Sequence, residues 1–206
     1  MSNRSIHTLL KNWDEECPLT REEAVEVLNL PEEEMDSLME CAYALRTKYK
    51  GKKVSVQLLT NVRSGNCTQN CAYCAQSKDS QAEIEKYKRV SDEKLYGDND
   101  LVDEKHLARH CIGLSGIGFS DEEIEDLADR IRELKKKDTQ ICCSIGFLTE
   151  KQARILKDAG LDRINHNLNS SRSFYPEICT THTYDQRVNN IKMLQSLGFE
   201  ICSGGI

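Results

Sequence analysis

Strand-like and helical segments alternate along this chain from Val54 onward, and this alternation limits the possible folds more than any other feature. Short apolar runs typical of strands begin near residues 54, 109, 140, 162 and 199. Between them lie segments with helical spacing, at 91–109, 120–137, 149–160 and 183–198. Strands that alternate with helices pair in parallel, because each helix carries the chain back to the same end of the sheet. The sequence therefore predicts a parallel α/β fold.

The strand count suggests an incomplete barrel. No glycine-rich dinucleotide-binding turn follows the first strand, which favours a (β/α) barrel over an open sheet. We expect about five strands over residues 51–206, whereas a closed TIM-type barrel has eight. The fold class is thus a partial TIM-type (β/α) barrel, and we expect a C-terminally truncated fragment. An open parallel edge would leave the isolated chain inactive and poorly soluble.

Residues 1–50 are predicted to form a helical extension that precedes the barrel. Thr20 followed by Glu23 makes a capping box at the start of one helix, and Pro31 opens the next. Cys17 and Cys41 lie in this extension. We expect both to be packing residues.

The stretch SGNCTQNCAYCAQS follows the first strand and carries Cys67, Cys71 and Cys74 in a C-x3-C-x2-C spacing. Three thiolates are one fewer than a [4Fe–4S] cube normally takes, and an iron without a protein ligand is open for chemistry. A zinc loop is the alternative, but zinc sites usually show a second ligand pair, C-x2-C or H-x3-5-H, and none follows. Unconnected core cysteines are the other alternative. The spacing favours an iron–sulfur centre.

Composition excludes several classes of protein. The formal net charge of −6 offers no basic surface for nucleic acid or anionic lipid. The sequence opens without the apolar core of a signal peptide, and no apolar run is long enough to span a membrane. We therefore expect a cytoplasmic protein, and in that reducing compartment ten cysteines indicate metal or redox chemistry and not disulfides.

Side-chain alternation predicts a second polar site, apart from the cysteine loop, inside the barrel. The second, third and fifth strands each offer a cysteine near mid-strand, and the fourth carries three asparagines of one parity: Cys111, Cys142, Cys202, Asn165, Asn167 and Asn169. Each amide without a partner would cost about 1–3 kcal/mol in an apolar core, and a polar ligand would remove that cost. A lone buried cysteine is usually a small core residue. Three of them beside the amides predict a second metal site.

Five segments together resemble one family. SGNCTQNCAYCAQS, RHCIGLSG, NHNLNSS, FYPEICTTHTYDQR and EICSGGI are similar to the biotin synthase family of radical S-adenosylmethionine (SAM) enzymes, in order from about Val54 to Ile206. The resemblance implies that Cys67, Cys71 and Cys74 hold a [4Fe–4S] cluster that binds SAM. The 5′-deoxyadenosyl radical released from SAM then abstracts hydrogen from the substrate.

The resemblance also implies a substrate and a second cofactor. In this family, sulfur from an auxiliary iron–sulfur cluster, here expected to be [2Fe–2S], is inserted into dethiobiotin. The residues that match its cysteine ligands are Cys111, Cys142 and Cys202. Cys143 is expected to face outward and pack, and Cys179 to be structural.

Further roles follow by position from the same resemblance. Tyr73 matches an aromatic residue against the SAM adenine, and Arg187 matches the arginine that pairs with the SAM carboxylate. Asn165 and Asn167 match residues that reach the substrate and the SAM ribose. Asn169, also expected to bind SAM, stands where the family often carries aspartate. His166 is expected in the core, and His182 receives no role.

The expected partners are a flavodoxin- or ferredoxin-type electron donor and a second copy of the chain, as a homodimer. Two other functions stay open. One is a radical SAM reaction on a different substrate, since a fold does not fix its substrate. The other is a non-catalytic iron–sulfur domain that senses redox state.

Overall fold

The computed structural model describes residues 19–205, and the chain divides into two compact units between Val54 and Ser55. The predicted domain boundary falls slightly earlier, after residue 50. Cys17 and the C-terminal Ile206 lie outside the described residues. Within the described range, the helices are too short or too polar to cross a bilayer.

The described part of the first unit, residues 19–54, contains two α-helices. Helix α2 (Arg21–Leu28) starts at Thr20, whose side chain forms the predicted capping box with Glu23. A 3-10 turn, η1 (Glu32–Glu34), leads into α3 (Met35–Lys50). Their contact is a small cluster of partly buried side chains: Leu19, Val27, Leu30, Leu38 and Cys41. Cys41 packs as predicted.

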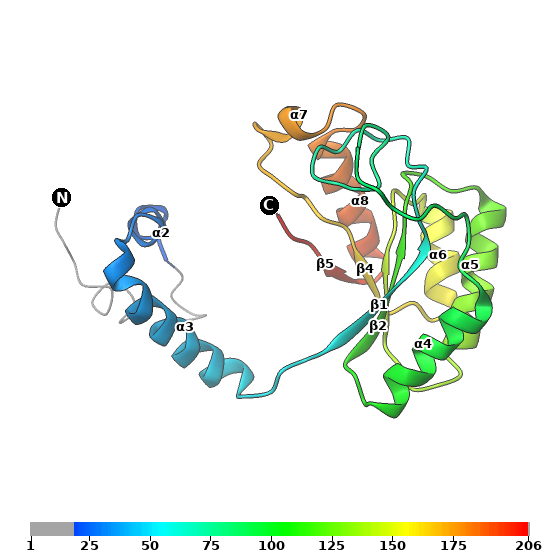
Figure 1. Cartoon of the computed structure of the whole chain (residues 1–206), viewed down its shortest axis with the longest axis horizontal. Coiled ribbons are helices and arrows are strands. Elements are labelled where there is room, and N and C mark those ends of the chain that lie inside the picture. Colours follow the sequence, from blue (N-terminus) through cyan, green and yellow to red (C-terminus); the bar gives the residue numbers. More distant parts are fainter. Residues whose placement is uncertain (1–18, 206) are drawn as a thin grey trace. The chain divides into compact units, whose positions relative to one another are not determined.

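The second unit contains a five-stranded parallel sheet. Strands pair in sequence order, so every crossover joins neighbours (Figure 1). The strands are β1 (Gln57–Arg63), β2 (Arg109–Leu114), β3 (Ile141–Ser144), β4 (Arg163–Asn165) and β5 (Glu200–Cys202). Within the described residues the sheet does not close. This is the predicted partial barrel.

The crossover helices form where their caps predict. They are α4 (Asp92–Glu104), α5 (Asp121–Leu134), α6 (Glu150–Asp158) and α8 (Tyr184–Ser196). Each has a serine or threonine N-cap whose side chain accepts a hydrogen bond from the first turn. One short helix was not predicted: α7 (Tyr175–Ile178). Pro176 stands in its first turn, a position that needs no hydrogen bond from the backbone nitrogen.

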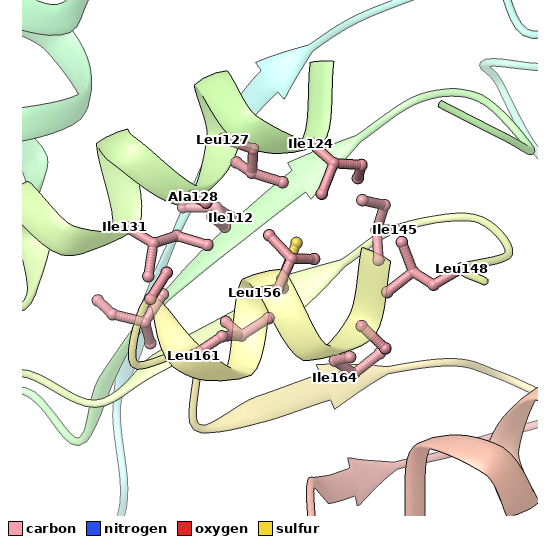
Figure 2. Close-up of a cluster of buried hydrophobic side chains, with 14 of the residues drawn as sticks. Ile112, Ile124, Leu127, Ala128, Ile131, Ile145, Leu148, Leu156, Leu161 and Ile164 are labelled. Carbon is pink, nitrogen blue, oxygen red and sulfur yellow. The ribbon is translucent and has the colours of Figure 1, made fainter. Parts of the chain in front are cut away.

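The hydrophobic core lies between the helices and one face of the sheet. Ile112, Cys143 and Ile164 stand side by side on β2, β3 and β4, and none is exposed to solvent. Figure 2 shows the apolar side chains of α5 and α6 directed toward this face. Cys143 therefore packs in the core, as predicted. Residues of the opposite parity, including Cys111 and Cys142, face the other side of the sheet.

One predicted strand is wrong in length. Strand β4 ends at Asn165, whereas alternation was expected to continue through Asn169. Asn169 adopts a left-handed conformation with φ of 67°, and its backbone nitrogen donates to the carbonyl oxygen of Gly204 at 2.9 Å. The chain therefore turns after β4. The three asparagines do not share one strand parity.

Candidate functional site

The cysteine loop leaves the carboxyl end of β1 through two left-handed residues. Gly65 and Asn66 have φ of 72° and 55°, which turns the chain sharply after the strand. The side chain of Gln76 accepts a hydrogen bond from the Gly65 nitrogen, and Lys78 donates its backbone N–H to the carbonyl of Gln69 at 2.9 Å. These contacts close the loop and hold its cysteines beside the sheet.

A second segment, residues 178–183, is tied to this loop across a long sequence distance (Figure 1 shows α7, in orange, at its start). The side chain of Asn70 donates to the Thr180 hydroxyl at 2.7 Å and accepts from the backbone nitrogens of Thr180 and Thr181 at 3.0 and 3.3 Å. Ala72 donates its backbone N–H to the Ile178 carbonyl at 2.9 Å. The two segments therefore form one structural unit.

A cavity of about 350 Å³ opens between the cysteine loop and the carboxyl ends of the strands. Its size falls in the usual range for small-molecule sites. Most residues with a predicted role line it together: Cys67, Cys71, Tyr73, Cys74, Asn165, Asn167, Asn169 and Arg187. The fold thus gathers the residues predicted to hold a cluster and SAM around a single space.

Two amide atoms of residues that line this cavity lack partners. Asn165 Oδ1 and Asn169 Nδ2 are buried without a hydrogen bond, whereas Asn167 Oδ1 accepts from the backbone nitrogen of Gly204 at 2.9 Å. Each unpaired atom costs about 1–3 kcal/mol. A ligand group that donates to Asn165 Oδ1, or one that accepts from Asn169 Nδ2, removes the cost at that atom, and a hydroxyl group can do either. The cavity therefore fits a polar ligand such as the hydroxyl-bearing ribose of SAM.

Arg187 is fixed by two buried neighbours. Its Nε donates to the Tyr175 hydroxyl at 2.6 Å, and Nη2 donates to His182 Nε2 at 2.9 Å. Burial and the positive charge of Arg187 lower the pKa of His182 to about 4. The ring is therefore neutral, with Nδ1–H donating to Gln69 Oε1 at 2.8 Å. His182, which received no role from the sequence, orients the guanidinium.

Cys71, Cys179 and His182 form a buried cluster. The sulfur atoms of Cys71 and Cys179 are 3.8 Å apart, and Cys179 Sγ is 3.3 Å from His182 Nδ1. Burial and the neighbouring Cys179 raise the pKa of Cys71 to about 11. Although burial opposes it, hydrogen bonds from Thr181 and the backbone lower the pKa of Cys179. The sequence signal that was missed is the spacing of Cys179 and His182, C-x2-H, which resembles that of paired metal ligands.

Cys111 and Cys142 stand next to each other on β2 and β3. A hydrogen bond from the Cys142 thiol lowers the pKa of Cys111 to about 7, against the effect of burial. The same hydrogen bond and burial raise the pKa of Cys142. Cys202 is exposed and pairs with Asn165, so it lies one row nearer the carboxyl ends of the strands. The three predicted auxiliary ligands lie on one face of the sheet, but Cys202 is not level with Cys111 and Cys142 across the strands.

Comparison with known proteins identifies the family. A model described as the Radical SAM superfamily matches residues 61–206, from within β1 to the end of the chain. The chain belongs to the radical SAM superfamily. The radical SAM part of the predicted resemblance is thereby confirmed. Membership implies a [4Fe–4S] cluster and SAM, and the three-cysteine loop with its adjoining cavity is the part of this chain suited to hold them.

Curated relatives within the radical SAM superfamily are named biotin synthase. Those of Geobacillus kaustophilus and Bacillus subtilis strain 168 are each 40% identical over 189 residues, and that of Rhodopirellula baltica is 38% identical over 190. These alignments cover 91%, 91% and 92% of this chain but 57%, 56% and 53% of the relatives. The chain thus spans little more than half their length.

Two solved structures share this fold. Methylornithine synthase (PylB) superposes with a TM-score of 0.82 at 16% identity, over 96% of this chain and 57% of that one. The FeFe-hydrogenase maturase HydG from Carboxydothermus hydrogenoformans gives 0.80 at 21% identity, over 97% and 47%. At these identities the likeness concerns the fold alone.

Proposed function

We propose that this chain carries the catalytic core of a biotin synthase, which inserts sulfur into dethiobiotin to give biotin. The observation that carries the proposal is the single cavity lined by the three loop cysteines, the asparagines and Arg187. The curated relatives named biotin synthase support this substrate over others. The overall reaction is proposed for the full-length natural protein.

In this proposal, Cys67, Cys71 and Cys74 hold the [4Fe–4S] cluster and leave one iron for SAM. With SAM bound, this cluster supplies the radical hydrogen abstraction that side chains cannot perform. Arg187, held by Tyr175 and His182, pairs with the SAM carboxylate through a charge-assisted hydrogen bond.

The remaining cavity residues orient the two ligands. Tyr73 lies against the adenine, while Asn167 and Asn169 bind the ribose. The unpaired Nδ2 of Asn169 is a donor suited to a ribose oxygen. Asn165, with Asn167, contacts dethiobiotin, and its unpaired Oδ1 can accept a hydrogen bond from an N–H group of the substrate.

The sulfur source in this proposal is an auxiliary [2Fe–2S] cluster held by Cys111, Cys142 and Cys202. A cysteine binds metal as its thiolate, and the hydrogen bond between Cys111 and Cys142 lowers the pKa of Cys111 while raising that of Cys142, so the first of the two protons leaves readily and the second leaves only when metal binds. A flavodoxin- or ferredoxin-type protein supplies electrons, and the enzyme works as a cytoplasmic homodimer.

Anaerobic reconstitution of the full-length protein with iron and sulfide tests the proposal. After SAM and a reductant are added, we expect 5′-deoxyadenosine, and with dethiobiotin also biotin. Cys71→Ala should abolish both products. Cys142→Ala should abolish biotin and keep 5′-deoxyadenosine, because only the auxiliary site is altered. Cys143→Ala, beside it in the core, is the matched control and should keep both.

Other results would point to the other functions. If 5′-deoxyadenosine forms but biotin does not, the protein is a radical SAM enzyme with another substrate. If a cluster assembles but SAM is never cleaved, the chain is a redox sensor. Normal SAM cleavage by Cys71→Ala would refute the proposed ligand set.

A further inference from the structure

The buried cluster of Cys71, Cys179 and His182 has the geometry of a mononuclear metal site. These residues are 8%, 3% and 6% exposed, and their ligand atoms lie within 4.8 Å of one another. No other group of three potential ligands in residues 19–205 meets that distance, including the three loop cysteines. Only Cys71 is shared with the predicted iron–sulfur site.

The distances match a tetrahedral ion. Two sulfur ligands at about 2.3 Å from such an ion lie ~3.8 Å apart, and a sulfur and an imidazole nitrogen ~3.6 Å apart. The sulfur atoms of Cys71 and Cys179 are 3.8 Å apart, and Cys179 Sγ is 3.3 and 3.8 Å from the two ring nitrogens of His182. The Cys71 sulfur lies within 4.8 Å of the His182 ligand nitrogen, and it would approach the ring when an ion binds between the three.

The site is also preorganised. Cys71 is 108 residues from Cys179 in sequence, yet the Asn70 side chain and the backbone bond from Ala72 to Ile178 hold the two segments together. Ligands fixed in this way lose little conformational freedom when they bind an ion.

The surroundings of His182 suit a metal ligand. Metal-binding histidines usually donate the second ring N–H to a nearby acceptor. With the ion on Nδ1, the ring proton moves to Nε2, which donates to Tyr175 Oη at 2.9 Å, and Arg187 gives up the hydrogen bond that it donates to Nε2 in the metal-free protein. Gln69 Oε1, 2.8 Å from Nδ1, lies close enough to serve as a fourth ligand in place of water. The guanidinium of Arg187 is the nearby positive charge. Two thiolates offset the charge of a divalent ion, so Arg187 does not face an additional net cation.

We propose that, when the iron–sulfur cluster is absent, Cys71, Cys179 and His182 bind one Zn²⁺ ion. Binding releases the two thiol protons to solvent and involves no redox step. Because Cys71 serves both sites, the zinc ion and the [4Fe–4S] cluster exclude each other. Zn²⁺ would therefore compete with cluster assembly.

Titration of the cluster-free, reduced protein with Co²⁺ tests this site, followed by displacement with Zn²⁺. We expect one equivalent to bind with the thiolate-to-cobalt charge-transfer absorption of a two-thiolate site. Cys179→Ser and His182→Asn should each weaken binding by more than the ~10–100-fold that loss of an outer-shell partner costs. Cys67→Ser is the matched control from the same loop and should bind Co²⁺ as the parent does.

Cluster reconstitution separates this inference from the proposed function. Cys179→Ser should lose the Co²⁺ site but still assemble the cluster and cleave SAM, whereas Cys67→Ser should show the reverse, and Cys71→Ser should lose both. If Cys67→Ser abolishes Co²⁺ binding while Cys179→Ser does not, the ion sits on the three loop cysteines and the inference is wrong. The absence of charge-transfer absorption in the parent protein would overturn it as well. Circular dichroism spectra of the metal-free variants check that each is folded.

Discussion

Acid should destabilise this protein through His182, and the size of the effect follows from the structure. The neutral ring accepts a hydrogen bond at Nε2 from Arg187 and donates Nδ1–H to Gln69. Burial and the Arg187 charge lower its pKa from 6.5 to about 4. The unfolded chain binds this proton more readily than the folded chain. The stability contribution is therefore complete above pH 6.5 and is lost as the pH falls toward 4.

The magnitude comes from proton linkage. At pH 5 an unfolded histidine is almost fully protonated, whereas His182 in the folded protein is mostly neutral. The linkage relation gives a loss of about 2 kcal/mol between pH 7 and pH 5 for this one group. Burial also lowers the pKa values of His110 and His166 to about 4, so both add to the loss of unfolding free energy as the pH falls.

The assay is urea unfolding of the cluster-free protein at pH 7 and pH 5, with a chelator present. His182→Asn should lower stability at pH 7 and reduce the pH-dependent loss by about 2 kcal/mol relative to the parent. His106→Asn, at an exposed histidine, controls for the substitution itself. Equal losses in the parent and in His182→Asn would refute the reasoning.

Two further predictions concern substitutions at neighbouring or matched positions. Gly146→Ala should destabilise the folded protein by a few kcal/mol, roughly the cost of overpacking, because the new Cβ would lie 2.3 Å from the Ile117 carbonyl oxygen. Gly97→Ala lies in open space within α4 and should instead stabilise the protein by ~0.5–1 kcal/mol. Thermal unfolding of both variants checks the opposite signs, and a loss in both would contradict the packing argument. Cys143→Ser should lower stability by about 1–3 kcal/mol, since it buries a hydroxyl, and leave the iron content after reconstitution unchanged, whereas Cys142→Ser should lower the iron content. Equal iron loss in both variants would contradict the assignment of Cys142, and not Cys143, as a cluster ligand.

Local patterns predicted most of the fold. The serine and threonine caps at Ser120, Thr149 and Thr183 act within one helical turn, so their effect can be read directly from the sequence. Strand parity likewise assigned Cys142 and Cys143 to opposite faces, because alternation is a property of any extended chain.

The same rule failed where the tertiary structure ended a strand. Asn167 and Asn169 were predicted to share the parity of Asn165, but β4 stops at Asn165, and Asn169 turns to meet Gly204 of the last segment. All three asparagines still reach the cavity. The predicted polar lining is therefore present, but a turn after β4, and not a longer strand, brings Asn167 and Asn169 to the cavity.

Three features could be predicted from the order of the residues: the alternation of strands and helices, the caps of the helices and the spacing of Cys67, Cys71 and Cys74. These depend on interactions between residues close in the chain. Only the tertiary structure brought Cys179 and His182 against Cys71, across more than a hundred residues. Contacts of that kind depend on how the helices and strands pack, and no local pattern records which distant segments a folded chain brings together.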